Sequence, residues 1–231
     1  MAPLTLAHPG ALAPPARDLA ARLAVRPFAE DLYLAGSAAL ALYLGHRPVR
    51  DLDLMTGTNR LAGPERRDLL QELLALDPAT EVETARDGYL FARLSDAGAG
   101  AGLRFFYYPY PLAEPCEELG DLQVASAVDL GLMKIAAIIS RGQKRDFVDL
   151  YLLCRELPLA ELLARAADKF GHVRDFPLQA LKGLADLSGT AGEPMPSLSS
   201  PLAWDEVAAW AESEVRALGR QAVGLSPALA P

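Results

Sequence analysis

Two aspartates separated by one leucine, Asp51 and Asp53, stand in the apolar run DLDLM at positions 51–55. If this run is a strand, both side chains point to the same face, because side chains alternate between the two faces of a sheet. Neighbouring carboxylates repel each other, and a divalent cation that prefers hard oxygen ligands, such as Mg²⁺, removes that cost. The pair therefore predicts a Mg²⁺ site, although two solvated acids on a strand edge would give the same pattern.

Gly36 and Ser37 form a second polar feature, between a strand-like run at 31–35 and an apolar helix-like run at 37–44. The unpaired N–H groups and the dipole at the start of a helix favour an anion such as phosphate. Glycine has no side chain, so a phosphate can approach the backbone closely. This arrangement predicts that the Gly-Ser pair holds phosphates, which a metal ion would bridge to the two aspartates.

A third group of charged residues lies in the second half of the chain. Lys134 interrupts an apolar helical run, and Arg141 follows seven residues later on the same helical face. The two cations could hold a triphosphate together, or they could be surface cations with extended stems. Asp146 and Asp149 begin the next helical run, where acids also stabilise the positive end of a helix dipole without any further role.

The elements that position these residues follow from hydrophobic periodicity and turn signals. Strands are expected at 31–35, 51–55, 80–86, 89–95 and 102–108. Helices are expected at 18–25, 37–44, 64–76, 126–140, 145–157, 158–170, 176–187 and 201–218. Asp87-Gly88 is typical of a hairpin turn. Ser126 is expected to cap a helix, with Asp129 three residues later.

These elements predict an α+β protein with a strand-rich N-terminal part and a helical C-terminal half. A flexible Gly/Ala-rich loop is expected at 96–102. The expected organisation is a flexible Pro-rich arm (1–15), a mixed core (16–122), a helical bundle that completes the site (123–187), a linker (188–201) and a C-terminal helix with a tail (202–231).

The composition limits the classes of partner. With 22 Lys and Arg against 30 Asp and Glu, the 231-residue chain has a net charge of -8, and no long basic run occurs. Phosphate backbones are bound by clustered Lys and Arg, so no extended nucleic-acid groove is expected. The two cysteines lack metal-type spacing, the N-terminal region lacks a signal-peptide pattern, and no apolar run reaches the ~18 residues of a membrane span. These features predict a cytoplasmic protein with reduced thiols and no membrane partner.

Two blocks of the chain carry a family resemblance. Thirteen residues separate Ser37 from Asp51, and Gly-Ser, such a spacer and D-L-D together resemble the polymerase-beta-like nucleotidyltransferase superfamily. The run LAGSAALALYLGHRPVRDLDLM is similar in detail to the AbiEii/AbiGii-type nucleotidyltransferase toxins. The run LQVASAVDLGLMKIAAIISRGQKRDFVDLYLL at 122–153 looks like the second block of the same family. The resemblance covers about residues 16–170.

The resemblance implies a minimal nucleotidyltransferase fold and Mg²⁺-dependent transfer of a nucleotide from an NTP to an acceptor. The acceptor could be tRNA, a protein or a small molecule, and a cognate antitoxin protein is an implied partner. The implied metal ligands are Asp51 and Asp53, and the other implied catalytic residues are Lys134 and Asp146. The implied NTP-binding residues are Gly36, Ser37, Arg47, Lys134 and Arg141, although Arg47 could equally have a structural role in the turn before the DLDLM strand.

The chain departs from the family pattern in two places. Val49 stands where the family has a serine, and the strand expected to supply a third carboxylate, within 102–111, contains no acid. Arg104 and Phe106 occupy the expected positions on that strand. The acids that remain as substitutes are Glu83, Glu114, Glu117 and Asp121. These departures keep open the alternative of a degenerate member that binds NTP or a partner without catalysis.

Overall fold

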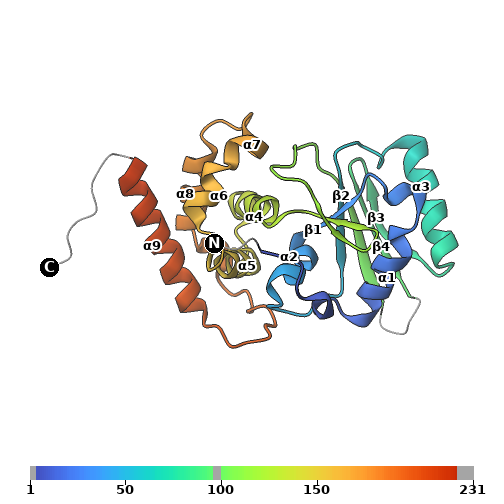
Figure 1. The fold of residues 1–231 in the computed structure, drawn as a ribbon, viewed down its shortest axis with the longest axis horizontal. Helices are drawn as coiled ribbons and strands as arrows, with labels where there is room; N and C mark the ends of the chain where they lie inside the picture. Colours follow the sequence, from blue (N-terminus) through green and yellow to red (C-terminus); the bar gives the residue numbers. More distant parts are fainter. Residues whose placement is uncertain (1–3, 96–99, 223–231) are drawn as a thin grey trace. The chain divides into compact units, whose positions relative to one another are not determined.

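The structure is a computed structural model that describes residues 4–95 and 100–222 (Figure 1). The chain divides into two compact units, Met1–Leu130 and Gly131–Pro231. Most of the loop expected at 96–102, the first three residues of the expected arm and the C-terminal tail beyond residue 222 lie outside the described residues.

A seven-stranded mixed sheet forms the centre of the first unit, in the strand order β3-β4-β5-β2-β1-β7-β6. Its strands are β1 (Tyr33–Ala35), β2 (Leu52–Thr56), β3 (Glu81–Arg86), β4 (Tyr89–Leu94), β5 (Ala101–Tyr107), β6 (Glu117–Leu119) and β7 (Leu122–Val124). Strands β2 and β5 are parallel, as are β1 and β7, and the other neighbours are antiparallel. The mixed sheet confirms the expected fold class, whereas the short β6–β7 hairpin was not predicted.

The two faces of the sheet differ because apolar and polar side chains alternate along its central strands. On one face Leu54 of β2, Leu103 and Phe105 of β5 and Leu90 of β4 are fully buried. The opposite face carries the charged and aromatic residues of the same strands, which are only partly buried. Asp53 of β2 and the preceding Asp51 belong to this second face.

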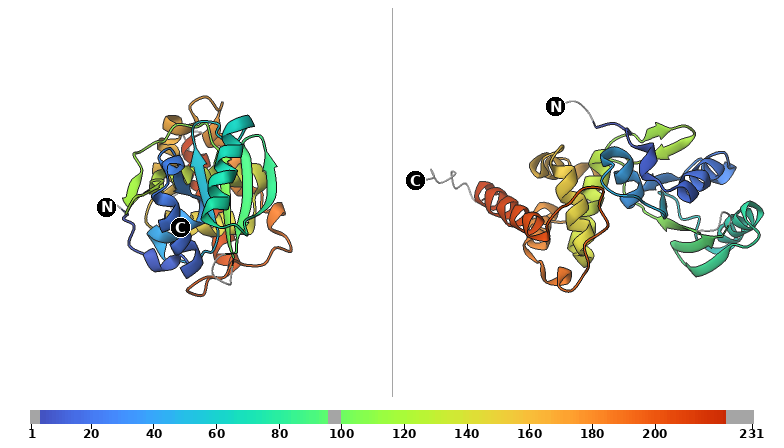
Figure 2. Two further views of the ribbon diagram at one scale, coloured as in Figure 1. Left: turned by 90° about the vertical axis from the view of Figure 1, so that its right-hand side faces the viewer. Right: turned by 90° about the horizontal axis from the view of Figure 1, so that it is seen from below.

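The helices of the first unit are α1 (Pro14–Ala24), α2 (Gly36–Leu44) and α3 (Gly63–Leu76), with 3₁₀ turns η1 (Pro9–Ala11) and η2 (Pro27–Ala29). Helices α1 and α3 lie side by side, and Arg22 donates a hydrogen bond to the carbonyl oxygen of Leu76 (Figures 1 and 2). The sequence predicts a loose arm over 1–15, whereas the structure pairs Leu12 with Val49 and begins α1 at Pro14.

Helix α2 follows β1 directly and is buried on all sides, from Ala38 to Tyr43. Its Ala- and Leu-rich sequence has no polar face, which is typical of a helix inside a core. Gly45 ends the helix in a left-handed conformation (φ 59°), which glycine adopts without a steric cost. The Tyr43 hydroxyl donates to the carbonyl of Ala125 at 3.1 Å, which fixes α2 next to β7.

Helix α4 (Ala127–Arg141) begins in the first unit and continues into the second. Its expected cap is confirmed, because the Asp129 N–H donates to Ser126 Oγ at 3.0 Å and Ser126 Oγ donates to Asp129 Oδ2 at 2.8 Å. Asp129 also accepts the backbone N–H groups of Ala113 and Glu114. A single carboxylate therefore anchors both the helix start and the segment before β6.

The second unit is helical. After α4 its elements are α5 (Lys144–Cys154), α6 (Leu159–Ala164), α7 (Ala166–Phe170), α8 (Phe176–Ala185), η3 (Ser188–Thr190) and α9 (Trp204–Ala222). Helix α9 packs along α8 and α5 (Figure 1), with Trp204 edge-on to Phe147 at 5.9 Å between ring centroids. The expected linker at 188–201 is anchored to α5 at Glu193. The Glu193 side chain accepts a hydrogen bond from the backbone N–H of Lys144, and its backbone carbonyl accepts one from the Lys144 side chain. Within the described part of the chain, no helix has the length and apolarity required to cross a bilayer.

Candidate functional site

Asp53 on β2 and Asp51, which immediately precedes this strand, lie on the partly exposed face of the sheet. Asp53 lies opposite Ala35 of β1 on one side and opposite Arg104 of β5 on the other. Since Ala35 immediately precedes α2, this register brings the second aspartate to the start of that helix. The expected strand–Gly–helix–strand order thus produces a shared location for two of the sequence motifs.

Gly36 and Asp53 are in close contact. Gly36 has a positive φ of 63°, and a Cβ atom at this position would overlap Asp53 Oδ2 and lie 3.1 Å from Asp53 Cγ. Both the backbone conformation and the close approach of a carboxylate therefore require glycine. Ser37 follows as the second residue of α2 and is partly buried. The first turn of α2 therefore lies directly beside Asp53 Oδ2.

Arg104 bridges the two aspartates. Its Nη2 donates to Asp51 Oδ2 at 2.6 Å, and its Nη1 donates to Asp53 Oδ1 at 3.2 Å. The guanidinium also lies 4.7 Å from the centroid of the Phe91 ring. Burial alone would lower the pKa of Arg104, but the charges of Asp53 and Asp51 outweigh it and raise the pKa. Arg104 therefore stays protonated and lies between two negative charges.

Gly102 supports the same arrangement from β5. Its backbone N–H donates to Asp51 Oδ1 at 3.1 Å, and a Cβ atom on Gly102 would lie 2.6 Å from that oxygen. Both oxygens of Asp51 thus accept hydrogen bonds from β5. The sequence alone gave no role to Gly102 and did not predict the bridge. The one available signal was the arginine at a position where the family resemblance leads one to expect an acid.

No third acid joins the two aspartates in the part of the chain that the structure describes, where no group of three or more His, Cys, Asp or Glu side chains could hold a metal ion. Glu83 lies on β3, two strands from β5, and forms an ion pair with Arg93 of β4. Glu117 lies on β6, at the other edge of the sheet. The two carboxylates of β2 are nevertheless a suitable set for one Mg²⁺ ion, which proteins usually bind through one or two carboxylates together with substrate phosphates and water.

A second cluster of charges lies within the second unit, between α4 and α5. Lys134 Nζ donates to Asp146 Oδ1 at 3.3 Å and lies 2.7 Å from Asp149 Oδ2. Arg141 donates from Nε to Asp146 Oδ2 at 2.7 Å and from Nη2 to Asp146 Oδ1 at 2.8 Å. Both aspartates are completely buried, whereas the Arg141 side chain is 47% exposed. The predicted cationic pair therefore does share one helical face, with Asp146 between its members.

The charges within this cluster balance. Burial alone would raise the pKa of Asp146, but the hydrogen bonds and charges of Arg141 and Lys134 outweigh it and lower the pKa. Asp149 forms an ion pair with Lys134, a contact that the sequence did not predict. A buried carboxylate requires such a partner, and the ammonium of α4 is that partner.

Comparison with known proteins identifies the family. A model of the "Nucleotidyl transferase AbiEii toxin, Type IV TA system" family matches residues 17–191. The chain belongs to this family. The match spans both the strand motif with its two aspartates and the α4–α5 cluster, which confirms the resemblance noted in the sequence.

Individual relatives are more distant. An uncharacterized protein of Aquifex aeolicus (strain VF5), aq_aa25, is 34% identical over 128 residues, which are 54% of this chain and 59% of that protein. The crystal structure of a nucleotidyltransferase candidate from H. pylori has a TM-score of 0.52 and 15% identity, and covers 91% of this chain and 96% of its own. The solution structure of the antibiotic-resistance factor ANT(2'')-Ia gives a TM-score of 0.42 and 16% identity, over 64% and 85% of the two chains. At such identities the H. pylori structure supports the fold alone.

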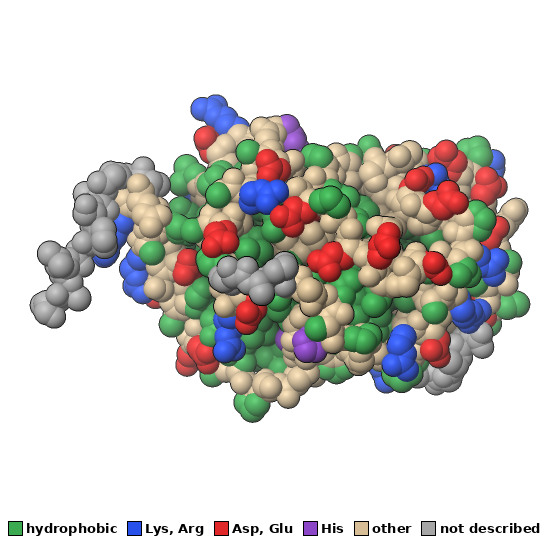
Figure 3. Space-filling view, in the orientation of Figure 1, with side chains coloured by type: hydrophobic (Ala, Val, Ile, Leu, Met, Phe, Trp, Pro, Cys, Tyr) green, Lys and Arg blue, Asp and Glu red, His purple; other side chains and the backbone are tan. Residues whose placement is uncertain are grey.

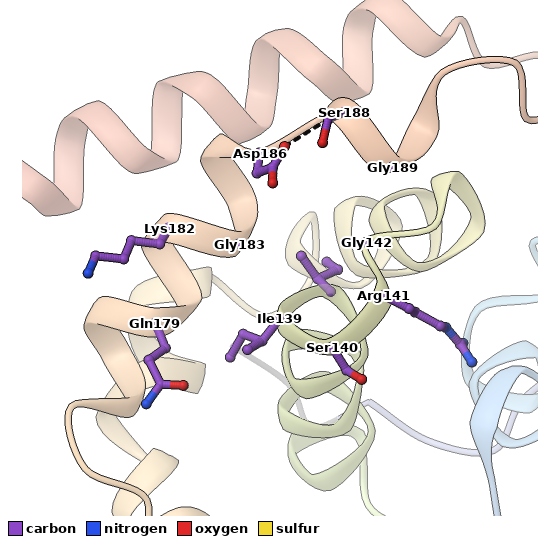
Figure 4. Close-up of a pocket in the computed structure, with 11 residues that line it drawn as sticks. Ile139, Ser140, Arg141, Gly142, Gln179, Lys182, Gly183, Asp186, Ser188 and Gly189 are labelled. Atoms are coloured by element: carbon purple, nitrogen blue, oxygen red, sulfur yellow. Dashed lines mark hydrogen bonds between the residues drawn. The ribbon is translucent and has the colours of Figure 1, made fainter.

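Two other features of this AbiEii-family chain bear on the site. Arg47 lies partly buried in the connection between α2 and β2. The second unit also contains a hollow of about 440 Å³ between the end of α4 and α8, lined by residues that include Gln179 and Lys182 (Figure 4). Arg141 is also one of the lining residues, although its side chain extends away from Gln179 and Lys182 (Figure 4).

The surface of the family member matches its acidic composition. On the face shown in Figure 3, acidic and basic side chains are interspersed with apolar ones, and no broad basic area appears among the described residues.

Proposed function

We propose that this protein is a Mg²⁺-dependent nucleotidyltransferase that moves a nucleotide from an NTP to an acceptor. The observation that carries the proposal is the contact of the Asp53 carboxylate with Gly36 at the start of α2. It brings a hard oxygen ligand together with the backbone N–H groups of a helix N-terminus, and these two groups bind metal and phosphate respectively.

The motif residues of the first unit each have a proposed role in binding metal or phosphate. Asp51 and Asp53 would hold the Mg²⁺ ion, and the backbone at Gly36 and Ser37 would bind the phosphates. A bound Mg²⁺ supplies positive charge that offsets the charge developing on the phosphate oxygens. Arg47 is proposed as a further phosphate contact.

The second unit would contribute the remaining cations. Arg141 has the more accessible charge, because nearly half of its side chain is exposed. Lys134 is held by two buried carboxylates, so its position is fixed before any substrate binds. Asp146 would hold both cations in place. Both cations are therefore anchored by Asp146, and they differ in how far their charges are exposed.

The proposed transfer requires no cofactor other than the metal. An acceptor hydroxyl oxygen bonds to the α-phosphorus, the bond from that phosphorus to the β-phosphate bridging oxygen breaks, and pyrophosphate leaves. The hydroxyl proton passes to solvent or to an acid of the segment that contains Glu114, Glu117 and Asp121. The acceptor is proposed to be tRNA, a protein or a small molecule, and the family description makes a cognate antitoxin protein the proposed regulatory partner.

The experiment is transfer of label from each of the four α-labelled NTPs to total tRNA and to cell protein. Wild type is compared with Asp53→Asn, which keeps the size of the side chain but removes the charge. We expect transfer to fall by roughly 100-fold or more, beyond the ~10–100-fold effect of losing an outer-shell partner of a metal. Gly57→Ala is the control, because Gly57 has open space around the position of a Cβ atom. Equal transfer by wild type and Asp53→Asn would reject the proposed site.

A second candidate function is favoured by the arginine on β5. If Arg104 replaces the third carboxylate without compensation, the protein would bind NTP or a partner protein and not catalyse transfer. Tight NTP binding that requires Asp53, with no transfer to any acceptor, would select this alternative.

A further inference from the structure

We propose that Arg104 is an internal counter-cation of the metal site, which holds Asp51 and Asp53 until Mg²⁺ and a triphosphate displace it together. This inference rests on the proposed function, because it concerns the same two aspartates. It adds a property that neither motif predicts, namely that metal and nucleotide bind as a coupled pair and that the metal alone binds weakly.

The hydrogen bonds of the carboxylates limit what a metal ion could use. Asp51 Oδ2 and Asp53 Oδ1 accept from Arg104, and Asp51 Oδ1 accepts from the Gly102 N–H. Asp53 Oδ2 is the oxygen that lies against Gly36. A metal ion that takes one oxygen of Asp51 must therefore compete for it either with the guanidinium or with the Gly102 N–H. Since the metal ion and the guanidinium are both cations, they also repel each other at this distance.

The bridge is exchangeable because it is partly exposed. The side chains of Arg104, Asp51 and Asp53 are 29%, 32% and 25% exposed, respectively. Ion pairs with such access to water are weak, since solvent screens the attraction. A divalent ion at the same carboxylates has twice the charge of the guanidinium, so it can replace it when phosphates complete the coordination.

The released guanidinium would have a new acceptor in the triphosphate. Arginine presents a planar fork of N–H donors that fits phosphate oxygens in a bidentate manner. The Phe91 ring, 4.7 Å away, would keep the guanidinium near the site after its release. The metal thus needs the nucleotide to accept the arginine, and the nucleotide needs the metal to free it. Such coupling is reciprocal, so each ligand raises the affinity for the other by the same factor.

The experiment is calorimetric titration of Mn²⁺, as a probe for Mg²⁺, with and without a non-hydrolysable NTP. Wild type is compared with Arg104→Met, which keeps the length and removes the charge. Arg93→Met is the matched control, because Arg93 lies on the same sheet face 5.1 Å from the Phe91 ring and pairs with Glu83. We expect Arg104→Met to bind Mn²⁺ alone roughly 10-fold more tightly, within the usual 5–150-fold range of coupling between sites.

The NTP analogue is expected to raise the Mn²⁺ affinity of wild type and of Arg93→Met by a similar factor, and that of Arg104→Met far less. Arg104→Lys provides a second test that does not depend on how well the methionine variant folds. Lysine keeps the charge but cannot bridge two carboxylates as the arginine fork does. The Mn²⁺ affinity of Arg104→Lys without nucleotide is therefore expected to lie between those of wild type and Arg104→Met.

The outcomes separate this inference from the proposed function. Equal Mn²⁺ affinity and equal coupling in wild type, Arg104→Met and Arg104→Lys would overturn the inference and leave the metal site intact. Weaker Mn²⁺ binding by Arg104→Met would also overturn it, because Arg104 would then order the aspartates for the metal. Absence of Mn²⁺ binding by all proteins, even with the NTP analogue, would reject the metal site itself and the inference with it.

Discussion

The β2–β5 site and the α4–α5 cluster contain the same kinds of groups but differ in burial. In the first, two aspartates share one arginine on a sheet face, and all three side chains are between 25% and 32% exposed. In the second, two aspartates with no exposed surface share Lys134, whose side chain is 8% exposed. The first has one negative charge in excess, whereas the second is neutral once Arg141 is included.

This difference indicates which cluster can exchange its partners. Charges in contact with water lose little when a partner leaves, since solvent compensates them. Buried charges without their partner face a large desolvation cost. The excess negative charge and the exposure of the β2–β5 site therefore suit it to take up a cation. The α4–α5 cluster is suited to hold Lys134 and Arg141 in fixed positions.

The largest effect is expected from Asp146→Ala, which leaves Lys134 and Arg141 with one carboxylate fewer inside the second unit. Breaking a buried ion pair by removing one partner typically costs ~3–5 kcal/mol. We expect a loss of this size in the free energy of unfolding, measured by urea denaturation. The control is Asp168→Ala, which breaks the exposed pair of Asp168 with Arg165 at 2.6 Å and should cost at most ~1 kcal/mol. Equal losses in the two variants would contradict the distinction between the clusters.

The next effect is expected from Gly36→Ala, which changes the β2–β5 site without altering a charge. A left-handed conformation costs an L-residue ~1–2 kcal/mol, and the new methyl group would overlap Asp53 Oδ2. We expect a modest loss of stability but a fall in nucleotide transfer of ~100-fold, because the carboxylate must move. Gly57→Ala is again the control. Unchanged transfer by Gly36→Ala would separate Asp53 from the reaction.

Much of the secondary structure follows from local sequence patterns. The strands at 80–86 and 89–95 and the helix at 64–76 were predicted to within about one residue, because alternation, Asp87-Gly88 and Pro64 are local signals. The β6–β7 hairpin was missed because three-residue strands show no periodicity. The helix expected at 158–170 is two short helices, which meet between Ala164 and Ala166.

The candidate site was predictable in its members but not in its contacts. The spacing of Gly36 and Asp53 indicated their proximity, since consecutive strands often pair. The bridge from Arg104 depends on the register between β2 and β5, which are separated by about fifty residues, and no local signal sets it. The pairing of Asp149 with Lys134 likewise depends on how α4 and α5 pack. Long-range register and packing are properties of the folded chain, so they appear only in the structure.

Acid is expected to weaken the buried α4–α5 cluster. The lowered pKa of Asp146 means that its carboxylate stabilises the fold above the ordinary aspartate range near pH 4. This stabilisation is lost as the pH falls through the lower folded-state pKa. We expect Asp146→Asn to show a weaker decline of the urea midpoint between about pH 5 and pH 2 than wild type. A parallel decline in the two proteins would mean that Asp146 does not contribute to acid sensitivity.

The smallest effect is expected from Asp51→Asn, with a change of at most ~1 kcal/mol in the free energy of unfolding. Arg104 keeps Asp53 as a partner, the amide oxygen can still accept the Gly102 N–H, and the repulsion between the two carboxylates is removed. Asp149→Asn, measured in the same urea titrations, should cost several times more, because Asp149 is buried against Lys134. The effects on Mn²⁺ affinity should have the opposite order. We expect Asp51→Asn to lose Mn²⁺ binding and Asp149→Asn to keep it. A destabilisation by Asp51→Asn as large as that by Asp149→Asn would place both clusters in one structural class and remove the argument that the β2–β5 site is built to exchange its cation.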